Sequence, residues 1–221
     1  MFADWKNDDL RLQPDFPSFK LGCKAIPVEK IGIRLKEPFG LLELLTYRTY
    51  LRLQPYASLS MVQGMATITN EKLLAHIQWL ESEGKSGRKL DETGMNLASN
   101  VLSGLNLARV QFVGTTLTKA DLSGTNLSEG DFSGSNFDSA NLSGADLSGA
   151  DLGGVSMRHA NLSSARLCGA DLSGANLEGA NLTEADFTDA DLIAANLNKT
   201  IQTGLIVKGA KLTDTQGLEV S

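Results

Sequence analysis

The chain has 221 residues, 42% of them hydrophobic, with 26 acidic and 20 basic side chains and a formal net charge of −6. Two cysteines make no disulfide framework, the acidic start MFADWKNDDL is unlike a secretory signal, and no apolar run is long enough to span a membrane. We therefore expect a cytoplasmic protein with reduced thiols.

The charge is divided unevenly along the chain. Residues 1–94 carry 13 basic and 12 acidic side chains, whereas residues 95–221 carry 7 basic and 14 acidic ones. An acidic surface repels phosphates, so we expect no direct nucleic-acid binding. The acidity favours a basic partner or simply solubility.

Residues 1–69 are predicted to form a small α or α+β domain of unknown type. Ile31, Ile33 and Leu35 alternate with Gly or charged residues, which is typical of a half-buried strand. The segment 39–53 reads as a helix that begins after Pro38 and ends before Pro55.

A second helix is predicted between residues 70 and 83. Thr69 or Asn70 can cap its start, and Gly84 can end it. Its apolar side is lined by Leu73, Leu74, Ile77 and Leu80. We assign residues 70–94 to a helical cap and linker.

From Leu97 an apolar residue falls on every fifth position, in units such as ADLSG. Between residues 95 and 214 there are 24 units; the central residue is apolar in 23, and the residue two before it is Ala in 13. A period of five fits neither helix nor strand, so each unit must combine a short extended piece with a turn. The Ala and the Leu share a face and point inward, and each unit forms one side and one corner of a coil.

The outward charges indicate four units per coil. At an interval of 20 residues, Arg158 lies between Asp138 and Glu178. Arg166 then lies between Asp146 and Asp186, whereas intervals of 15 or 25 place hydroxyl residues beside Arg158. Stacked residues about 4.8 Å apart feel each other's charge, so the four-sided register is favoured.

The A(D/N)LSG units resemble the pentapeptide-repeat family. The segment HIQWLESEGKSGRKL resembles the helical lead-in that often precedes such repeats in bacterial, and especially cyanobacterial, proteins. The resemblance implies a β-solenoid, a right-handed four-sided β-helix of about six coils over residues 95–214, with a tail at 215–221. It also implies a non-enzymatic protein, because the best understood members imitate DNA to bind topoisomerases and most others are thought to be protein-interaction surfaces.

Both ends of a solenoid expose apolar core and unpaired backbone, so something must cover them. We expect His76, Trp79 and Leu80 to form a structural cap over the first coil, where Met95, Leu105 and Val110 point inward. At the other end Gln202 replaces a core residue, and we read TIQTGLIVKGAKL as a last, irregular coil.

The four-sided register places four aspartates in one column, namely Asp131, Asp151, Asp171 and Asp191. Each can accept a hydrogen bond at its own corner, or the column can form a negative strip for a basic groove of a partner. A metal site is not expected, since a straight ladder does not converge on one point. A second face carries Asn141, Asn161 and Asn181, whose side chains can bond along the column.

No catalytic group is predicted. The two histidines, His76 and His159, lie far apart in the register, and every repeat glycine falls at a corner. We expect no enzyme, no cofactor and no metal. Two functions stay open: a protein-interaction scaffold that uses the N-terminal domain and the β-helix faces, or a DNA mimic that binds a type II topoisomerase through the acidic face.

Overall fold

The computed structural model describes residues 68–219. The chain divides into two compact units, Met1–Arg48 and Thr49–Ser221, and the described residues belong to the second. The strand predicted around Ile33 and the helix predicted over 39–53 lie outside the described residues. The assignment of residues 1–69 to a domain of their own stays a prediction.

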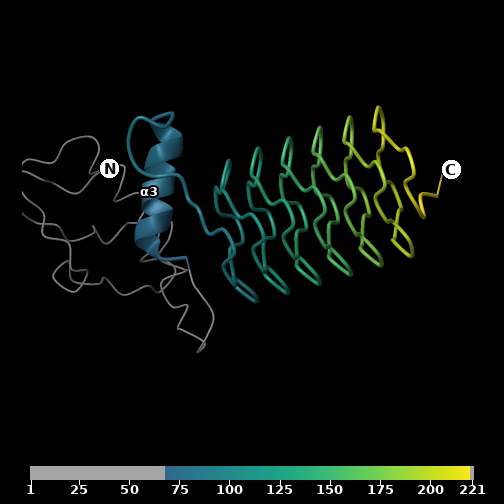
Figure 1. Cartoon of the computed structure of the whole chain (residues 1–221), viewed down its shortest axis with the longest axis horizontal. Coiled ribbons are helices and arrows are strands. Elements are labelled where there is room, and N and C mark those ends of the chain that lie inside the picture. The colour runs from purple at the N-terminus through teal and green to yellow at the C-terminus, as the bar shows by residue number, and fades with distance from the viewer. Residues whose placement is uncertain (1–67, 220–221) are drawn as a thin grey trace, which may run out of the picture. The chain divides into compact units, whose positions relative to one another are not determined.

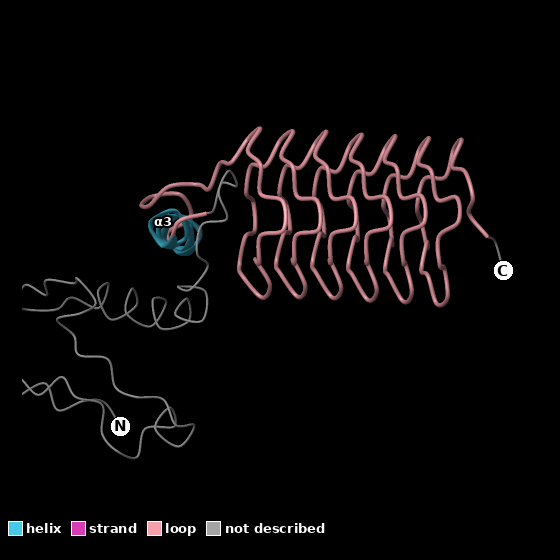
Figure 2. Ribbon diagram, turned by 90° about the horizontal axis from the view of Figure 1, so that it is seen from below, coloured by secondary structure: helices cyan, strands magenta, loops and turns pink. Residues whose placement is uncertain are grey.

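Stacked coils make up most of the described chain (Figure 1). Twenty-two parallel bridges each join two residues that are 20 positions apart, from Asp91↔Gln111 to Asn196↔Gln216. The predicted four units per coil is therefore confirmed, and the predicted neighbours of Arg166 are its bridge partners. The bridges begin one unit before residue 95 and give just over six coils. Because each bridge is a single residue, the ribbon draws the coils as loops (Figure 2).

Backbone hydrogen bonds hold neighbouring coils together. In one repeat, the Leu152 N–H donates to the Asp171 carbonyl at 2.7 Å and the Gly154 N–H donates to the Ser173 carbonyl at 2.9 Å. The same pair of bonds recurs along the stack. The coil closes only if its backbone groups meet those of the next coil in this register.

Each corner is a β-turn that the sequence of the unit encodes. The Val155 N–H donates to the Leu152 carbonyl at 3.3 Å, and Gly154, the third residue of this turn, has φ of +63°. Glycine adopts this left-handed conformation without steric cost. The Asp151 carboxylate accepts a hydrogen bond from the Gly153 N–H at 3.0 Å. This Asx bond explains why Asp or Asn precedes the central Leu so often.

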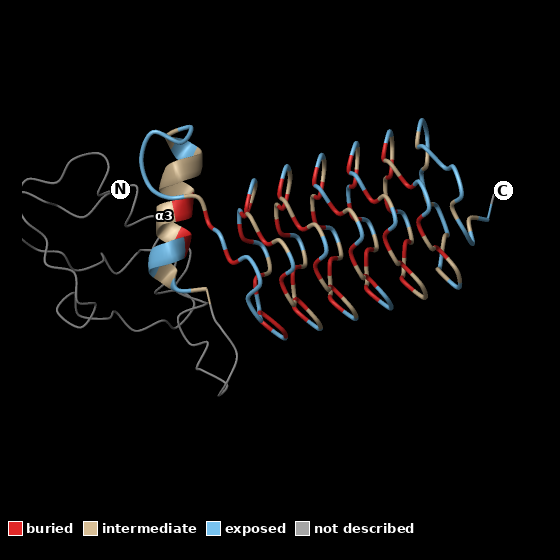
Figure 3. Cartoon of the chain, in the orientation of Figure 1, coloured by how far each residue is buried: buried red, intermediate tan, exposed pale blue. Residues whose placement is uncertain are grey.

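Inward Leu, Ala and Phe side chains fill the coils, and the buried residues recur at the same places in every coil except the last (Figure 3). Phe112 and Phe132 pack edge to face with ring centroids 5.9 Å apart, and Phe132 packs on Phe137 at 5.6 Å. Gly130 takes the place of an Ala here because a Cβ would lie 2.5 Å from the Phe132 ring. Full burial of each Leu or Phe contributes about 1.5–3 kcal/mol, so the core carries the stability of the stack.

The one described helix, α3, spans Asn70–Glu81. The Thr69 hydroxyl, one of the two predicted caps, accepts from the Lys72 N–H at 3.3 Å. The helix ends at Glu81, two residues earlier than expected, and Ser82 is its C-cap. Leu73 is buried in the hydrophobic core and Leu74 packs against it. α3 therefore covers the first coil through its first two turns.

The cap differs from the prediction in three side chains. His76 is fully buried, but Trp79 and Leu80 are half-buried and lie outside the core cluster. Trp79 stacks on His76 with centroids 5.9 Å apart, so it supports the histidine instead of covering the coil. Met95, expected to point inward, is 39% exposed, because the first coil has no preceding coil to cover it fully.

The loop after α3 explains the glycines of the lead-in segment. The Arg88 N–H donates to the Ala75 carbonyl at 2.9 Å and ties the loop back to the helix. A Cβ on Gly87 would lie 2.3 Å from the Ala75 oxygen, and a Cβ on Gly84 would lie 3.3 Å from Nε1 of Trp79. The loop can cross α3 this closely only because these positions lack side chains.

The last coil is regular in its backbone, contrary to the prediction. Ile201, Ile206 and Lys211 bridge to the coil before them in the same 20-residue register. Only the side chains change. Gln202, in a core position, donates from Nε2 to the Gly217 carbonyl at 2.8 Å and accepts from the Glu219 N–H at 3.0 Å, so it closes the end with polar contacts.

Gly87→Ala should destabilise the cap much more than Gly114→Ala. Both positions have positive φ, so both substitutions incur the left-handed cost of about 1–2 kcal/mol. Only at Gly87 does the new methyl group collide with backbone, which adds about 1–3 kcal/mol. Hydrogen exchange of residues 70–81 and the thermal melt by circular dichroism measure the difference. Equal losses in the two variants would show that the loop does not press on α3.

Candidate interaction surface

The predicted aspartate column exists as a continuous ladder. Asp131 bridges to Asp151, Asp151 to Asp171, and Asp171 to Asp191. Asp151 and Asp171 are exposed, and the other two are half-exposed. Ser133, Gly153 and Ser173 follow them, so small residues leave the carboxylates accessible. We call these four aspartates the acidic strip.

Each carboxylate of the strip is tied to its own corner. The Oδ1 atoms of Asp131, Asp151, Asp171 and Asp191 accept hydrogen bonds from the backbone N–H two residues ahead, at 3.1, 3.0, 2.8 and 3.1 Å. One carboxylate oxygen thus serves the turn. The second oxygen is left to face solvent or a neighbour, so the structural and the binding role are compatible.

The strip is balanced by a cation at only one end. Lys211 Nζ lies 2.8 Å from Oδ2 of Asp191, and this hydrogen bond with Lys211, together with that of the Ile193 N–H, lowers the pKa of the Asp191 carboxyl. Among the ion pairs of residues 68–219 none involves Asp131, Asp151 or Asp171. Three successive carboxylates, spaced at about 4.8 Å, thus carry negative charge without a partner.

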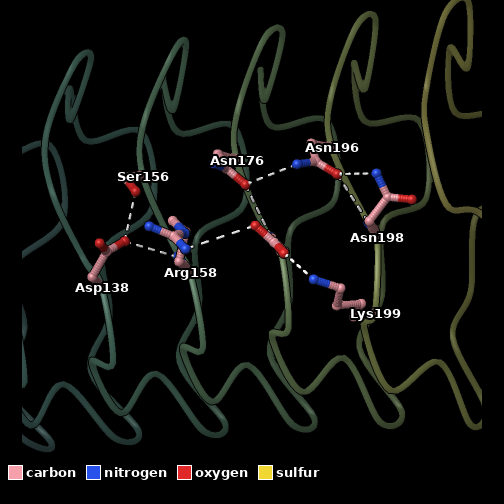
Figure 4. A network of polar contacts seen from close by, with 8 residues as sticks. Asp138, Ser156, Arg158, Asn176, Asn196, Asn198 and Lys199 are labelled. Carbon is pink, nitrogen blue, oxygen red and sulfur yellow. Dashed lines mark hydrogen bonds and ion pairs between the residues drawn. The ribbon is translucent and has the colours of Figure 1, made fainter.

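A neighbouring face shows the contrasting arrangement, in which charges alternate (Figure 4). The Asp138 carboxylate accepts from the Arg158 N–H at 2.9 Å, and the Arg158 guanidinium lies 3.8 Å from Glu178. Lys199 Nζ lies 2.7 Å from the other oxygen of Glu178, and its hydrogen bond lowers the pKa of that carboxyl. Negative and positive side chains therefore neutralise each other along this face.

The remaining faces are also largely neutralised. Asn161 Nδ2 donates to Asn141 at 3.2 Å and Asn181 Nδ2 donates to Asn161 at 3.3 Å, which confirms the predicted amide ladder. On the next face Arg166 bridges between two aspartates. In no other column of the described coils do charges of one sign follow one another over three coils. The acidic strip is therefore the electrostatically distinct surface.

Two charged residues escaped the sequence reading. Lys211 ends the strip, and its 20-residue distance from Asp191 would have revealed it. Glu92 occupies an inward position, five residues before Leu97, and is 3% exposed, with Lys72 of α3 at 2.6 Å. The five-residue period could also have predicted this position, because extending it by one unit before Leu97 places the Glu92 side chain inside the coil.

No group of three or more His, Cys, Asp or Glu side chains that could hold a metal ion occurs among residues 68–219. Cys168 is half-buried at a corner, and burial, followed by the neighbouring Asp186, raises the pKa of its thiol. The described part of the chain also contains no helix long and apolar enough to cross a bilayer.

Comparison with known proteins identifies the repeat. Eight copies of the family model for pentapeptide repeats match the chain, over residues 96–134, 116–154, 135–174 and 160–198. A pentapeptide repeat protein from the thylakoid lumen of Arabidopsis thaliana is 35% identical over 44% of this chain and 68% of its own, with a TM-score of 0.33. HetL, involved in heterocyst differentiation regulation in the cyanobacterium Nostoc sp. strain PCC 7120, is 33% identical over 61% of this chain and 75% of its own, with a TM-score of 0.24.

The repeated family match and these identities show that the chain belongs to the pentapeptide repeat family, whose members fold as right-handed four-sided β-helices. QnrB1, a plasmid-mediated fluoroquinolone resistance protein, is 21% identical over 55% of this chain and 68% of its own, with a TM-score of 0.39. The comparison with curated proteins finds no match.

Lys211→Gln should raise the pKa of Asp191, because it removes the hydrogen bond and the positive charge that lower it. A lowered native pKa stabilises the fold above the unfolded pKa of an aspartate, and this stability is lost as the pH falls through the native value. The variant should therefore show a weaker acid dependence of unfolding in this range. Carboxyl NMR titration measures the pKa directly.

Lys208→Gln is the matched control, since Lys208 lies one side of the coil away and forms no ion pair among the described residues. It should leave the Asp191 titration unchanged. An unchanged titration in Lys211→Gln as well would mean that this pair does not form in solution.

Proposed function

We propose that the protein is a non-enzymatic scaffold for protein–protein interaction, and that the acidic strip is one of its binding surfaces. The observation that supports this most is the contrast between the faces: charges alternate or pair on the other sides, but Asp131, Asp151 and Asp171 remain unpaired. Mutual repulsion along the strip is a small cost that a basic partner would remove.

The filled core of the β-helix is consistent with binding at its outer faces. Its central side chains from Leu97 to Leu197 are buried Leu and Phe residues and one Met, so the coils offer outer faces to a partner. The family resemblance agrees with an interaction protein. We propose further that residues 1–69 provide a second binding element, that the protein is cytoplasmic, and that it binds no nucleic acid directly. The Arabidopsis relative, by contrast, comes from the thylakoid lumen.

A type II topoisomerase bound through DNA mimicry is the alternative, and the acidic strip is the feature that favours it. Six coils at about 4.8 Å give a rod of about 29 Å, which is short for a duplex mimic. A gyrase supercoiling assay separates the two functions. Inhibition, or protection from a quinolone, at stoichiometric protein would favour the mimic over the scaffold.

The partner can be obtained by affinity capture from the native host, with full-length protein and residues 49–221 as parallel baits. Loss of a specific partner from the shorter bait would place its binding site in the first unit. Retention by both baits would assign it to the unit that contains the β-helix.

Replacing all four aspartates of the strip by Asn should leave the fold intact, because Asn keeps the acceptor that each corner needs. The binding constant of a captured basic partner should fall, and its salt dependence should weaken. Binding measured at two ionic strengths, with a circular dichroism melt, tests this.

The matched control carries the same change of charge elsewhere: Asp121, Asp146, Asp186 and Asp189 replaced by Asn. It should retain the affinity and most of the salt response. If the two quadruple variants bind alike, only the net charge matters and the strip is not a site. If the strip variant unfolds, the carboxylates hold the corners.

A further inference from the structure

One buried histidine lies where α3 meets the start of the β-helix. His76 has no exposed surface, and its Nδ1 accepts a hydrogen bond from the Leu90 N–H at 3.1 Å. The proton of the neutral ring therefore resides on Nε2. Nε2 makes no regular hydrogen bond within residues 68–219, although the Ala108 carbonyl of the first coil lies near enough to raise the pKa of the ring and partly offset the effect of burial.

His76 lies where the regular backbone hydrogen bonds of the β-helix begin, and it supplies one acceptor there. In the later repeats the N–H at the position of Leu90 closes its own turn, as when the Val110 N–H donates to the Leu107 carbonyl, and the carbonyl at the position of Ala108 accepts from the coil before, as when that of Ser128 accepts from the Arg109 N–H. At the start of the β-helix the His76 imidazole accepts the Leu90 N–H in place of a turn carbonyl, and the Ala108 carbonyl accepts no backbone bond from a preceding coil among the described residues. Few other polar contacts hold the helix there, namely the Lys72–Glu92 pair at 2.6 Å and the Arg88 bond to Ala75.

A protonated imidazole does not fit this site. Its Nδ1 would carry a hydrogen and face the N–H of Leu90, so two donors would oppose each other. The positive charge would also be buried away from water, which is costly without a compensating anion. Of the charged groups nearby, Lys89 repels it, while Glu92 is bonded to Lys72 and not to the imidazole. Among the described residues, the one buried carboxylate nearby, that of Glu92, is already paired with Lys72.

We infer that α3 is an acid-released cover: protonation of His76 displaces the helix and the loop after it from the first coil. The rest of the β-helix stays folded, because its core and its ladder contain no other buried histidine. Release would uncover Leu105 and Val110 and the carbonyl of Ala108, a strand edge that can pair with another chain.

The size and sign of the effect follow from the titration of His76. Burial, with a smaller contribution from Lys89, lowers its pKa from 6.5 to about 4 in the docked state. The undocked helix therefore binds the proton first as the pH falls, and docking weakens between pH 6.5 and pH 4. With these two values the docking equilibrium constant falls about 30-fold from pH 7.5 to pH 5.

The test compares the full chain with His76→Gln by hydrogen exchange at pH 7.5 and pH 5, after correction for the intrinsic pH dependence of exchange. In the wild-type protein, peptides within residues 70–90 should lose about 30-fold in protection at pH 5, while peptides within 141–180 should keep theirs. Gln can accept from the Leu90 N–H but does not titrate, so the variant should show no such pH response.

His159→Gln is the matched control, since His76 and His159 are the two histidines of the chain. It should behave as the wild type. Equal pH responses in wild type and His76→Gln would overturn the inference, as would a pH response lost in His159→Gln.

A second measurement needs no stable variant. Histidine NMR of the wild-type chain should show one imidazole, in contact with Trp79, that stays neutral well below pH 6. If that resonance titrates near pH 6.5 while the exchange of α3 is unchanged, the cover is not controlled by His76.

Discussion

The closure of each coil after 20 residues is the constraint on which every other feature of this protein depends. Backbone groups of one coil bond to those of the next, so Leu152 must meet Asp171 and Gly154 must meet Ser173. Given this register, the inward residues of all but the last coil are buried against those of the coils beside them, and each outward residue is stacked on the residue 20 positions away. The core, the corners and the surface columns therefore all follow from the 20-residue register.

The same register forces the two ends to be different from the middle. At the first coil the ladder lacks a preceding coil, and α3 supplies Leu73 for the core and His76 for the backbone. At the last coil Gln202 folds its amide over the end and bonds to Gly217 and Glu219. Polar groups thus close both ends of the stack, and one of them, His76, resists protonation until the pH is well below 6.5.

Much of this could be predicted from the sequence because the repeat imposes its geometry on nearly every residue. The four-sided coil, the aspartate column and the amide ladder required only the interval of 20. The prediction failed where repetition stops. The five-residue period does not indicate that Trp79 stacks on His76 or that Met95 is exposed. It also does not indicate that the last coil keeps its backbone register although its side chains change. The pairing of Lys211 with Asp191 was readable from the interval but was overlooked, whereas the binding role of the strip depends on a partner that the sequence does not contain.

The native Cys168 allows a direct test of the 20-residue register. With Cys23 replaced by Ser, a second cysteine at Ser148 lies one coil away, next to Cys168, because Gly149 bonds to the Cys168 carbonyl at 2.9 Å. Neighbouring coils are about 4.8 Å apart, within the Cα separation of a disulfide. Ser143→Cys and Gly153→Cys place the new thiol at intervals of 25 and 15 instead. The account predicts that copper-catalysed oxidation forms an intramolecular disulfide in Ser148→Cys alone, detected by mass spectrometry after digestion. Equal or faster formation in either of the other variants would contradict it.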